Sequence, residues 1–244
     1  METKIWAHRG ASAYAPENSM EAFVMAQKMG ADGIELDIHL TKDGHVVVAH
    51  DETVDRCSNG SGYIIDKTLT ELMELDFSNG KENYSNTRIP TLEQVLEFIK
   101  TSGLYLNIEI KSGIVLYDGI EEKTIRLVSK MGLEDKVIYS SFNHYSLSIV
   151  KKLNPAAPIG LLYSEAMVDP YVYARHLGAE AIHPHFKTLM VPGTIHNCKK
   201  HGIKIHTWTV DEREHIIWLI NEEVDAIMTN RPDFAISLRN TYKG

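Results

Sequence analysis

A regular alternation between helix-like and strand-like segments is the feature that most restricts how this chain can fold. Five expected helices end on a glycine and are followed within a few residues by a strand-like segment; the glycines are Gly30, Gly103, Gly132, Gly178 and Gly202. Glycine is common at this place because it enters the left-handed backbone conformation without a steric penalty. Helices that alternate with strands indicate a parallel sheet joined by helical crossovers. The sequence therefore predicts the α/β class.

Nine segments have the composition of strands, whereas a closed (β/α)₈ barrel needs eight. They are residues 4–8, 33–37, 46–50, 104–111, 137–141, 159–163, 181–184, 203–210 and 225–229. Segment 46–50 is the exception, because only residues 41–44 separate it from its expected neighbour. Parallel neighbours need a much longer crossover, whereas Asp43-Gly44 favours a hairpin. We predict a TIM-type barrel with a short β-hairpin at its mouth after strand 2, although the sequence leaves open whether 46–50 is a barrel strand.

Three residue pairs have the spacing of a helix-capping box. They are Asn18 with Glu21, Thr68 with Glu71, and Thr91 with Gln94. We expect a helix to begin at each of them. No Pro/Gly-rich linker and no shift in composition divides the chain, so we predict a single domain over residues 1–244.

Two acidic residues alternate with apolar ones in the second expected strand. Glu35 and Asp37 fall on one face, and Ile34 and Leu36 fall on the other. Two neighbouring carboxylates inside a protein repel each other and lose their hydration, so they need compensation. A divalent cation is the obvious candidate, because Mg²⁺ and Ca²⁺ prefer oxygen ligands.

Polar residues also gather at the ends of the other expected strands, where barrel enzymes place their active sites. They are His8, Arg9, His50, Asp51, Glu109, Lys111, Ser140, Ser141, His183, His185, His206 and Trp208. This inventory suits a hard cation and a phosphate, with histidine as acid and base. The histidines outside this set, such as His39, His45, His144 and His215, are expected on the surface.

The overall charge limits the choice of partners. A formal net charge of -8 gives no electrostatic reason to expect nucleic acid or an anionic membrane. The sequence has no signal-like apolar segment at its start and no run approaching the length of a membrane span. We therefore expect a cytoplasmic protein without stable membrane insertion that acts on a small molecule. A homo-oligomer is left open.

Several motifs, in this order and spacing, closely resemble the glycerophosphodiester phosphodiesterase family of the bacterial cytoplasmic type. They are His8-Arg9-Gly10, Pro16-Glu17-Asn18-Ser19, Glu35-Leu36-Asp37, Thr41-Lys42-Asp43-Gly44, His50-Asp51, Ile108-Glu109-Ile110-Lys111 and Trp208-Thr209-Val210. The resemblance runs from Trp6 to about Pro232 and implies a TIM-type barrel. It also implies metal-dependent hydrolysis of glycerophosphodiesters, such as glycerophosphocholine or glycerophosphoethanolamine, to sn-glycerol 3-phosphate and an alcohol. Residues 52–88 resemble the family's variable insertion over the barrel mouth.

The resemblance also implies roles for individual residues. By motif, the ligands of one divalent cation, Mg²⁺ or Ca²⁺, correspond to Glu35, Asp37 and Glu109. The catalytic pair corresponds to His8 and His50, and the cations on the phosphate side correspond to Arg9 and Lys111. Glu17 and Trp208 are further candidates for substrate contacts, although Glu17 could be a helix-entry residue and Trp208 a core residue.

Acid–base chemistry at a phosphodiester needs one histidine to deprotonate the nucleophile and another to protonate the leaving alkoxide. We favour His8 as the base and His50 as the acid, although the sequence does not fix the direction. The nucleophile is either water or the 2-hydroxyl of the substrate's glycerol.

Three alternatives compete with this interpretation. A phospholipase D-type enzyme of the same fold would act on lysophospholipids and would need an apolar patch near the mouth. A non-catalytic phosphodiester-binding barrel would have lost a histidine or a carboxylate, and none is missing. An amidohydrolase would bind Zn²⁺ through His183 and His185.

Overall fold

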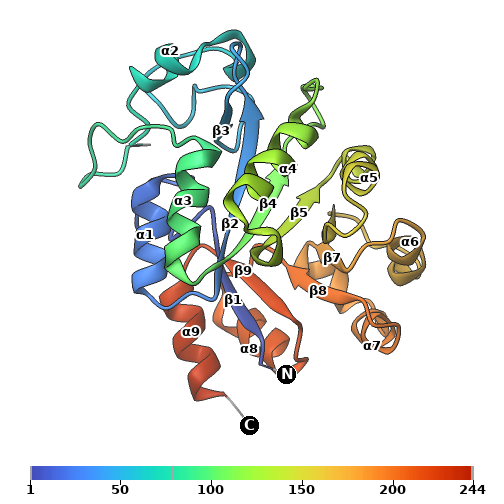
Figure 1. Cartoon of the computed structure of the whole chain (residues 1–244). Coiled ribbons are helices and arrows are strands. Elements are labelled where there is room, and N and C mark those ends of the chain that lie inside the picture. Colours follow the sequence, from blue (N-terminus) through green and yellow to red (C-terminus); the bar gives the residue numbers. More distant parts are fainter. Residues whose placement is uncertain (1, 79, 243–244) are drawn as a thin grey trace.

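Eight parallel strands close into a barrel in the computed structural model, which describes residues 2–78 and 80–242 (Figure 1). The barrel strands are β1 (Lys4–His8), β2 (Gly33–Leu40), β4 (Tyr105–Ile110), β5 (Val137–Ser141), β6 (Ile159–Tyr163), β7 (Ala181–Pro184), β8 (Lys204–Thr207) and β9 (Ala226–Thr229). Their order is β1-β9-β8-β7-β6-β5-β4-β2, and pairing between β1 and β2 closes the ring. The predicted (β/α)₈ barrel is confirmed.

The remaining strand, β3 (Val46–Val48), lies outside the barrel and pairs antiparallel with the outer end of β2. The turn that reverses the chain contains Gly44 at a φ of 82°, a conformation that glycine adopts readily. The predicted hairpin is therefore confirmed, and this segment is not a barrel strand. The N–H of Ala49 donates to the carbonyl of Asp37 (3.0 Å), so the hairpin brings His50 beside β2.

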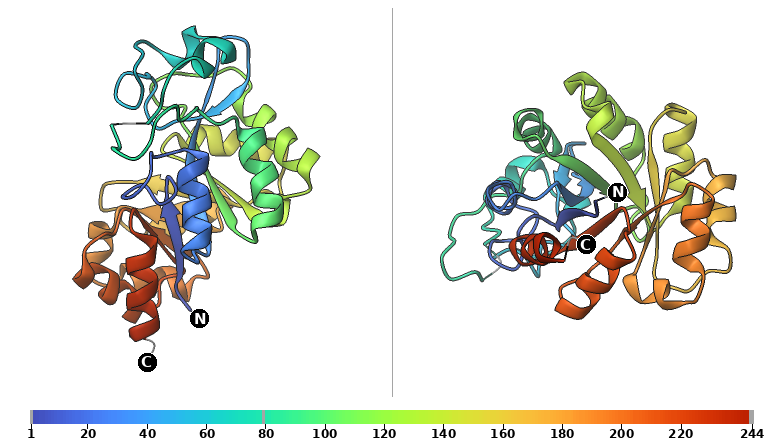
Figure 2. Two further views of the ribbon diagram at one scale, coloured as in Figure 1. Left: turned by 90° about the vertical axis from the view of Figure 1, so that its left-hand side faces the viewer. Right: turned by 90° about the horizontal axis from the view of Figure 1, so that it is seen from below.

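Most helices pack around the outside of the barrel (Figure 2). The α-helices are α1 (Met20–Lys28), α2 (Leu69–Met73), α3 (Leu92–Ser102), α4 (Ile120–Met131), α5 (His144–Leu153), α6 (Pro170–His176), α7 (Thr194–Lys200), α8 (Arg213–Asn221) and α9 (Pro232–Thr241). Short 3₁₀ helices are η1 (Ile64–Asp66), η2 (Glu134–Lys136) and η3 (Phe186–Met190). Every helix in the described ranges is too short or too polar to span a bilayer. The capping boxes predicted at Thr68 and Thr91 are confirmed.

The capping box predicted for Asn18 and Glu21 is wrong. Ser19 is the N-cap of α1, and its Oγ accepts a hydrogen bond from the N–H of Ala22 (3.1 Å). Asn18 has a φ of 55°, whereas an N-cap needs extended backbone. Its Nδ2 donates instead to Oδ2 of Asp37 (2.9 Å), so Asn18 belongs to the polar end of the barrel.

The alternation predicted for β2 positions the polar residues. Ile34 and Leu36 are completely buried in the main core between the barrel and its helices. Glu35 and Asp37 therefore face the barrel interior. A second apolar cluster contains Trp6, Ile138, Ala181, Ala226 and Met228. Each of its residues belongs to a barrel strand. Glu35 and Asp37 therefore lie next to an apolar cluster inside the barrel.

Residues 52–78 and 80–88 form a layer with η1 and α2 at the end of the barrel that carries the hairpin (Figure 1). This layer and the hairpin share a small apolar cluster of Val47, Ala49, Val54, Ile64, Leu72, Phe77 and Ile89. The first strand begins and the last helix ends at the opposite end of the barrel (Figures 1 and 2).

The expectation that His39 lies on the surface is wrong, because this residue is completely buried. Strand β2 runs on to Leu40, beyond its expected end, and the hairpin covers it. The His39 ring lies 2.7 Å from the hydroxyl of Tyr117 and 3.2 Å from the carbonyl of His50, so both ring nitrogens have partners. His45 is exposed as expected.

Candidate active site

Three carboxylates meet where β2 and β4 pair. Asp37 and Glu109 lie opposite each other in the parallel register, and Glu35 lies opposite His8 of β1. One oxygen from each carboxylate of Glu35, Asp37 and Glu109 lies within 4.8 Å of the other two. The exposed fractions of these residues are 2%, 1% and 8%. The predicted ligand set is therefore assembled and almost removed from solvent.

Burial and mutual repulsion make this acidic cluster electrostatically costly. Burial, reinforced by Asp37 and Glu109, raises the pKa of Glu35 well above its ordinary value. Burial and the charge of Asp37 raise the pKa of Glu109 to about 7. Burial also acts to raise the pKa of Asp37, but Lys111 and Arg9 outweigh it and lower that pKa to about 2. Arg9 and Lys111 therefore outweigh burial at Asp37 but not at Glu35 or Glu109.

The cluster fits a hard divalent cation. Oδ1 of Asp37 is buried without a hydrogen-bond partner, although Nζ of Lys111 lies 3.8 Å from it. A buried polar atom without a partner needs a physical explanation. A bound cation would supply positive charge next to all three carboxylates. Carboxylate oxygens are the ligand atoms that Mg²⁺ and Ca²⁺ prefer. No other group of three or more such side chains occurs within residues 2–78 and 80–242.

His8 ends β1 with a neutral partner. Its Nδ1 lies 2.8 Å from Oδ1 of Asn230, whose Nδ2 donates to Asp211 (2.6 Å). Because Asp211 can only accept from this amide, the amide oxygen faces His8 and Nδ1 of His8 carries the proton. Burial, assisted by Arg9, lowers the pKa of His8 to about 4. Its Nε2 is therefore an unprotonated acceptor near neutral pH.

His50 follows the hairpin and has a charged partner. Its Nδ1 lies 2.6 Å from Oδ1 of Asp51, and its Nε2 lies 3.4 Å from Nζ of Lys111. Arg56 of the insertion donates to both oxygens of Asp51, at 2.8 and 3.0 Å. The hydrogen bond from Arg56 overcomes partial burial and holds the pKa of Asp51 well below its usual range. His50 thus lies against a permanent carboxylate.

Two cations border the carboxylates. The N–H of Arg9 donates to Glu35 (2.9 Å), and its Nε lies 3.5 Å from Oδ2 of Asp37. Arg9 has a φ of 56°, a left-handed conformation that is uncommon for this residue and turns the chain at the end of β1. Lys111 lies 3.1 Å from Glu109. Glu17 is no simple helix-entry residue, because it accepts from Arg9 (3.1 Å) and also pairs with Arg56.

A cavity of about 210 Å³ opens between these groups. It is lined by His8, Arg9, Glu35, His50, Asn107, Glu109, Phe142, Leu162, Trp208 and Met228. Trp208 packs edge-on against Phe142 with ring centroids 5.5 Å apart, and its Nε1 donates to the carbonyl of His183. One wall of the cavity is therefore apolar and the other is charged.

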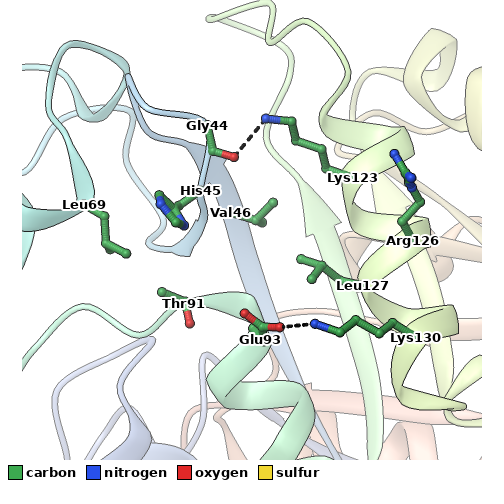
Figure 3. Close-up of a pocket in the computed structure, with 10 residues that line it drawn as sticks. All are labelled: Gly44, His45, Val46, Leu69, Thr91, Glu93, Lys123, Arg126, Leu127 and Lys130. Carbon is green, nitrogen blue, oxygen red and sulfur yellow. Dashed lines mark hydrogen bonds and ion pairs between the residues drawn. The ribbon is translucent and has the colours of Figure 1, made fainter.

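A larger cavity of about 670 Å³ lies elsewhere, between the hairpin, the start of α3 and one face of α4 (Figure 3). Its cations are already partnered: Lys123 with the carbonyl of Gly44, Lys130 with Glu93, and Arg126 with Glu122. None of the predicted site residues lines it. Cavity size alone therefore does not locate the chemistry in this molecule.

All nine predicted site residues converge on the barrel mouth, whereas the His183/His185 pair does not form a metal centre. His183 is buried and lies 3.0 Å from the ring of His206. Sequence reasoning missed Asn230 and Arg56. Asn230 directly follows β9, so the same strand-end rule could have found it. Arg56 lies in an irregular segment without any pattern that points to the site.

The fold and site together define a (β/α)₈-barrel enzyme with two histidines beside a candidate metal centre. The chain belongs to the glycerophosphoryl diester phosphodiesterase family, whose profile matches residues 8–234, as the motifs indicated.

Relatives with the same architecture agree with this assignment. A glycerophosphodiester phosphodiesterase from Caldanaerobacter subterraneus is 48% identical over 98% of both chains. A phosphodiesterase from Oleispira antarctica, solved with the product sn-glycerol-3-phosphate, is 29% identical with a TM-score of 0.87, over 98% of this chain and 97% of that one. A glycerophosphodiester phosphodiesterase from Agrobacterium tumefaciens is 29% identical with a TM-score of 0.85, over 96% and 99%.

Proposed function

We propose that this chain hydrolyses glycerophosphodiesters to sn-glycerol 3-phosphate and an alcohol. The observation that carries this proposal is the placement of His8 and His50 in one cavity with Arg9 and the buried carboxylates. The product bound to the Oleispira antarctica relative supports sn-glycerol 3-phosphate as the product here.

The cofactor would be one divalent cation, Mg²⁺ or Ca²⁺, held by Glu35, Asp37 and Glu109. When bound, such an ion neutralises charge on a phosphoryl oxygen and lowers the barrier to attack at phosphorus. Arg9 would bind a second phosphate oxygen, because its guanidinium is planar and permanently charged. Lys111 would add a further positive charge on the same side.

His8 would act as the base. The amide of Asn230 fixes the proton on Nδ1, so Nε2 of His8 is free to accept a proton from the nucleophile. Its lowered pKa keeps the ring neutral at working pH. The nucleophile is water or the substrate's own 2-hydroxyl, and either would give up its proton to this nitrogen.

His50 would act as the acid. Its Nδ1 lies 2.6 Å from the carboxylate of Asp51, and the ring lines the cavity, with Nε2 3.4 Å from Nζ of Lys111. Protonated Nε2 of His50 would then donate to the leaving alkoxide.

The direct test is a coupled assay in which glycerol-3-phosphate dehydrogenase detects the product released from glycerophosphocholine. We expect EDTA to abolish release and added Mg²⁺ or Ca²⁺ to restore it. Release of phosphocholine instead of choline would place the cleaved bond on the other side of phosphorus and contradict the proposal. No turnover with any glycerophosphodiester would favour a binding barrel.

One observation favours a second candidate, a phospholipase D-type activity on lysophospholipids. Large apolar residues are exposed on the loops after β4 and β6 and in the first turn of α5, at 76% for Ile114, 80% for Leu116, 92% for Val168 and 84% for Tyr145. Such residues could contact an acyl chain. Choline release from lysophosphatidylcholine at a higher kcat/KM than from glycerophosphocholine would select this activity. The cytoplasmic location stays a prediction.

A further inference from the structure

Arg56 belongs to the insertion, yet its guanidinium lies between two carboxylates of the barrel mouth. It makes four hydrogen bonds: to Asp51 at 2.8 and 3.0 Å, and to Glu17 at 2.9 and 2.7 Å. The planar fork of arginine matches two carboxylates in a way that a lysine ammonium does not. This geometry ties three segments of the chain to one side chain.

On one side the contact reaches His50. Oδ1 of Asp51 accepts from Arg56 and also lies 2.6 Å from Nδ1 of His50. Arg56 also occupies Oδ2, so the carboxylate plane is fixed from behind. A rotation of this plane would move the carboxylate away from Nδ1 of His50 and would let the imidazole turn.

On the other side the contact reaches Arg9. Oε1 of Glu17 accepts from Arg56 and from Arg9, at 2.7 and 3.1 Å. Glu17 is well buried, with 14% of its side chain exposed, so its carboxylate needs these cations. The proposed phosphate contact and the proposed acid are therefore held by one residue that is neither part of the acidic cluster nor among the residues that line the cavity of about 210 Å³.

We propose that Arg56 is a positioning residue through which the insertion orients His50, by way of Asp51, and Arg9, by way of Glu17. This role rests on the proposed hydrolase function and extends it to residues 52–88. Insertion packing and proton transfer are thereby linked, and a chain whose insertion is displaced loses the orientation of its acid.

The chain offers a matched control in Arg88. This arginine is also exposed and anchors the insertion, but its guanidinium donates to the backbone carbonyls of Glu74 and Leu75 (3.3 and 2.7 Å). Arg88→Met removes an anchor of the insertion and leaves the hydrogen bonds of Asp51 and Glu17 in place. It separates general loosening of the segment from loss of the specific contacts.

The test is a double-mutant cycle on kcat for glycerophosphocholine with Arg56→Met, Asp51→Asn and the double variant. We expect Arg56→Met to lower kcat by about 10²-fold, because a small misplacement of a catalytic group has that cost. The double variant should lose less kcat than the product of the two single losses, because both single changes break the contact between Arg56 and Asp51. What Arg56→Met adds to Asp51→Asn then measures the contact through Glu17. Arg56→Lys should stay impaired although it keeps the charge.

Three results would overturn the proposal: Arg56→Met with the kcat of the wild type, Arg88→Met with an equal loss, or a double variant in which the two losses multiply. Thermal unfolding of each variant shows that it is folded. Arg56→Lys, which keeps the charge, decides the question if Arg56→Met does not fold.

A second readout does not depend on turnover, so failure of the proposed function is distinguishable from failure of this inference. Hydrogen–deuterium exchange of the metal-loaded protein would report the backbone amides of residues 50–57. We expect faster exchange there in Arg56→Met and no change in Arg88→Met. Unchanged exchange in Arg56→Met would refute the role even in a chain that hydrolyses nothing.

Discussion

The two histidines of the cavity have opposite surroundings. His8 ends a barrel strand, lies against the neutral amide of Asn230, and is held ultimately by Asp211 beside the last strand. His50 lies beyond the barrel on the hairpin, with 31% of its side chain exposed, against the carboxylate of Asp51. The barrel therefore gives His8 a neutral hydrogen-bond partner, Asn230, whereas the hairpin gives His50 a charged partner, Asp51.

This difference suits the opposite roles, base and acid, that we propose for the two histidines. Two histidines in like surroundings would titrate together, and one of them would always be in the wrong form. Separate partners remove that conflict. The closed barrel fixes the position of His8. The orientation of His50 depends instead on the insertion, which packs on the barrel through its own small apolar cluster.

The largest effect is expected from a change in the acidic cluster, on which both histidines depend. Asp37→Asn removes one charge from the ligand set while keeping the shape of the side chain, so neither histidine has an activated phosphate to act on. We expect no measurable hydrolysis at saturating Mg²⁺ or Ca²⁺ and loss of bound metal, measured by elemental analysis after dialysis. A variant with near-normal kcat would remove Asp37 from the proposed ligand set.

A smaller effect is expected when His8 is given the surroundings of His50. Asn230→Asp combined with Asp211→Asn places the carboxylate on the residue that contacts His8 and keeps an amide–carboxylate contact between the two positions. This exchange stabilises the imidazolium and raises the pKa of His8 from about 4. A base works only when unprotonated, so the acid limb of kcat/KM should move to higher pH. Each unit of that shift lowers the rate on the limb by about tenfold.

The control for this exchange is Ser12→Ala, because Ser12 donates to the same Asn230 oxygen without adding charge (2.8 Å). Its acid limb should stay where the wild type has it. An enzyme with Asn230→Asp and Asp211→Asn whose alkaline limb moves, while the acid limb stays, would assign His8 as the acid and reverse the proposed direction.

The sequence was most informative where strand geometry decides the position of a side chain. Alternation along β2 predicted that Glu35 and Asp37 share a face, and the strand-end rule added His8, Glu109 and Lys111. The same logic failed at His39, because β2 continues into a hairpin that covers it. Local patterns show where a strand is but not what later packs against its extension.

Irregular segments limited the rest. Asn18 fits the composition of an N-cap, and only its positive φ turns the side chain toward Asp37. Arg56 follows no strand and no helix, so neither periodicity nor capping could connect it to Glu17. Contacts of this kind depend on how the insertion folds back over the mouth, which no local spacing encodes.

The smallest effect tests whether the barrel and its insertion unfold as one unit, as the prediction of a single domain requires. Two matched capping boxes are available: Thr91 begins α3 on the barrel, and Thr68 begins α2 in the insertion. Thr→Ala at an N-cap costs about 1 kcal/mol. In one cooperative unit, each change should lower the single melting temperature by about 2–4 °C, measured by calorimetry. Thr68→Ala that leaves the main transition in place and creates an earlier, smaller one would show that the insertion melts separately, and His50 would then lose its support before His8 does.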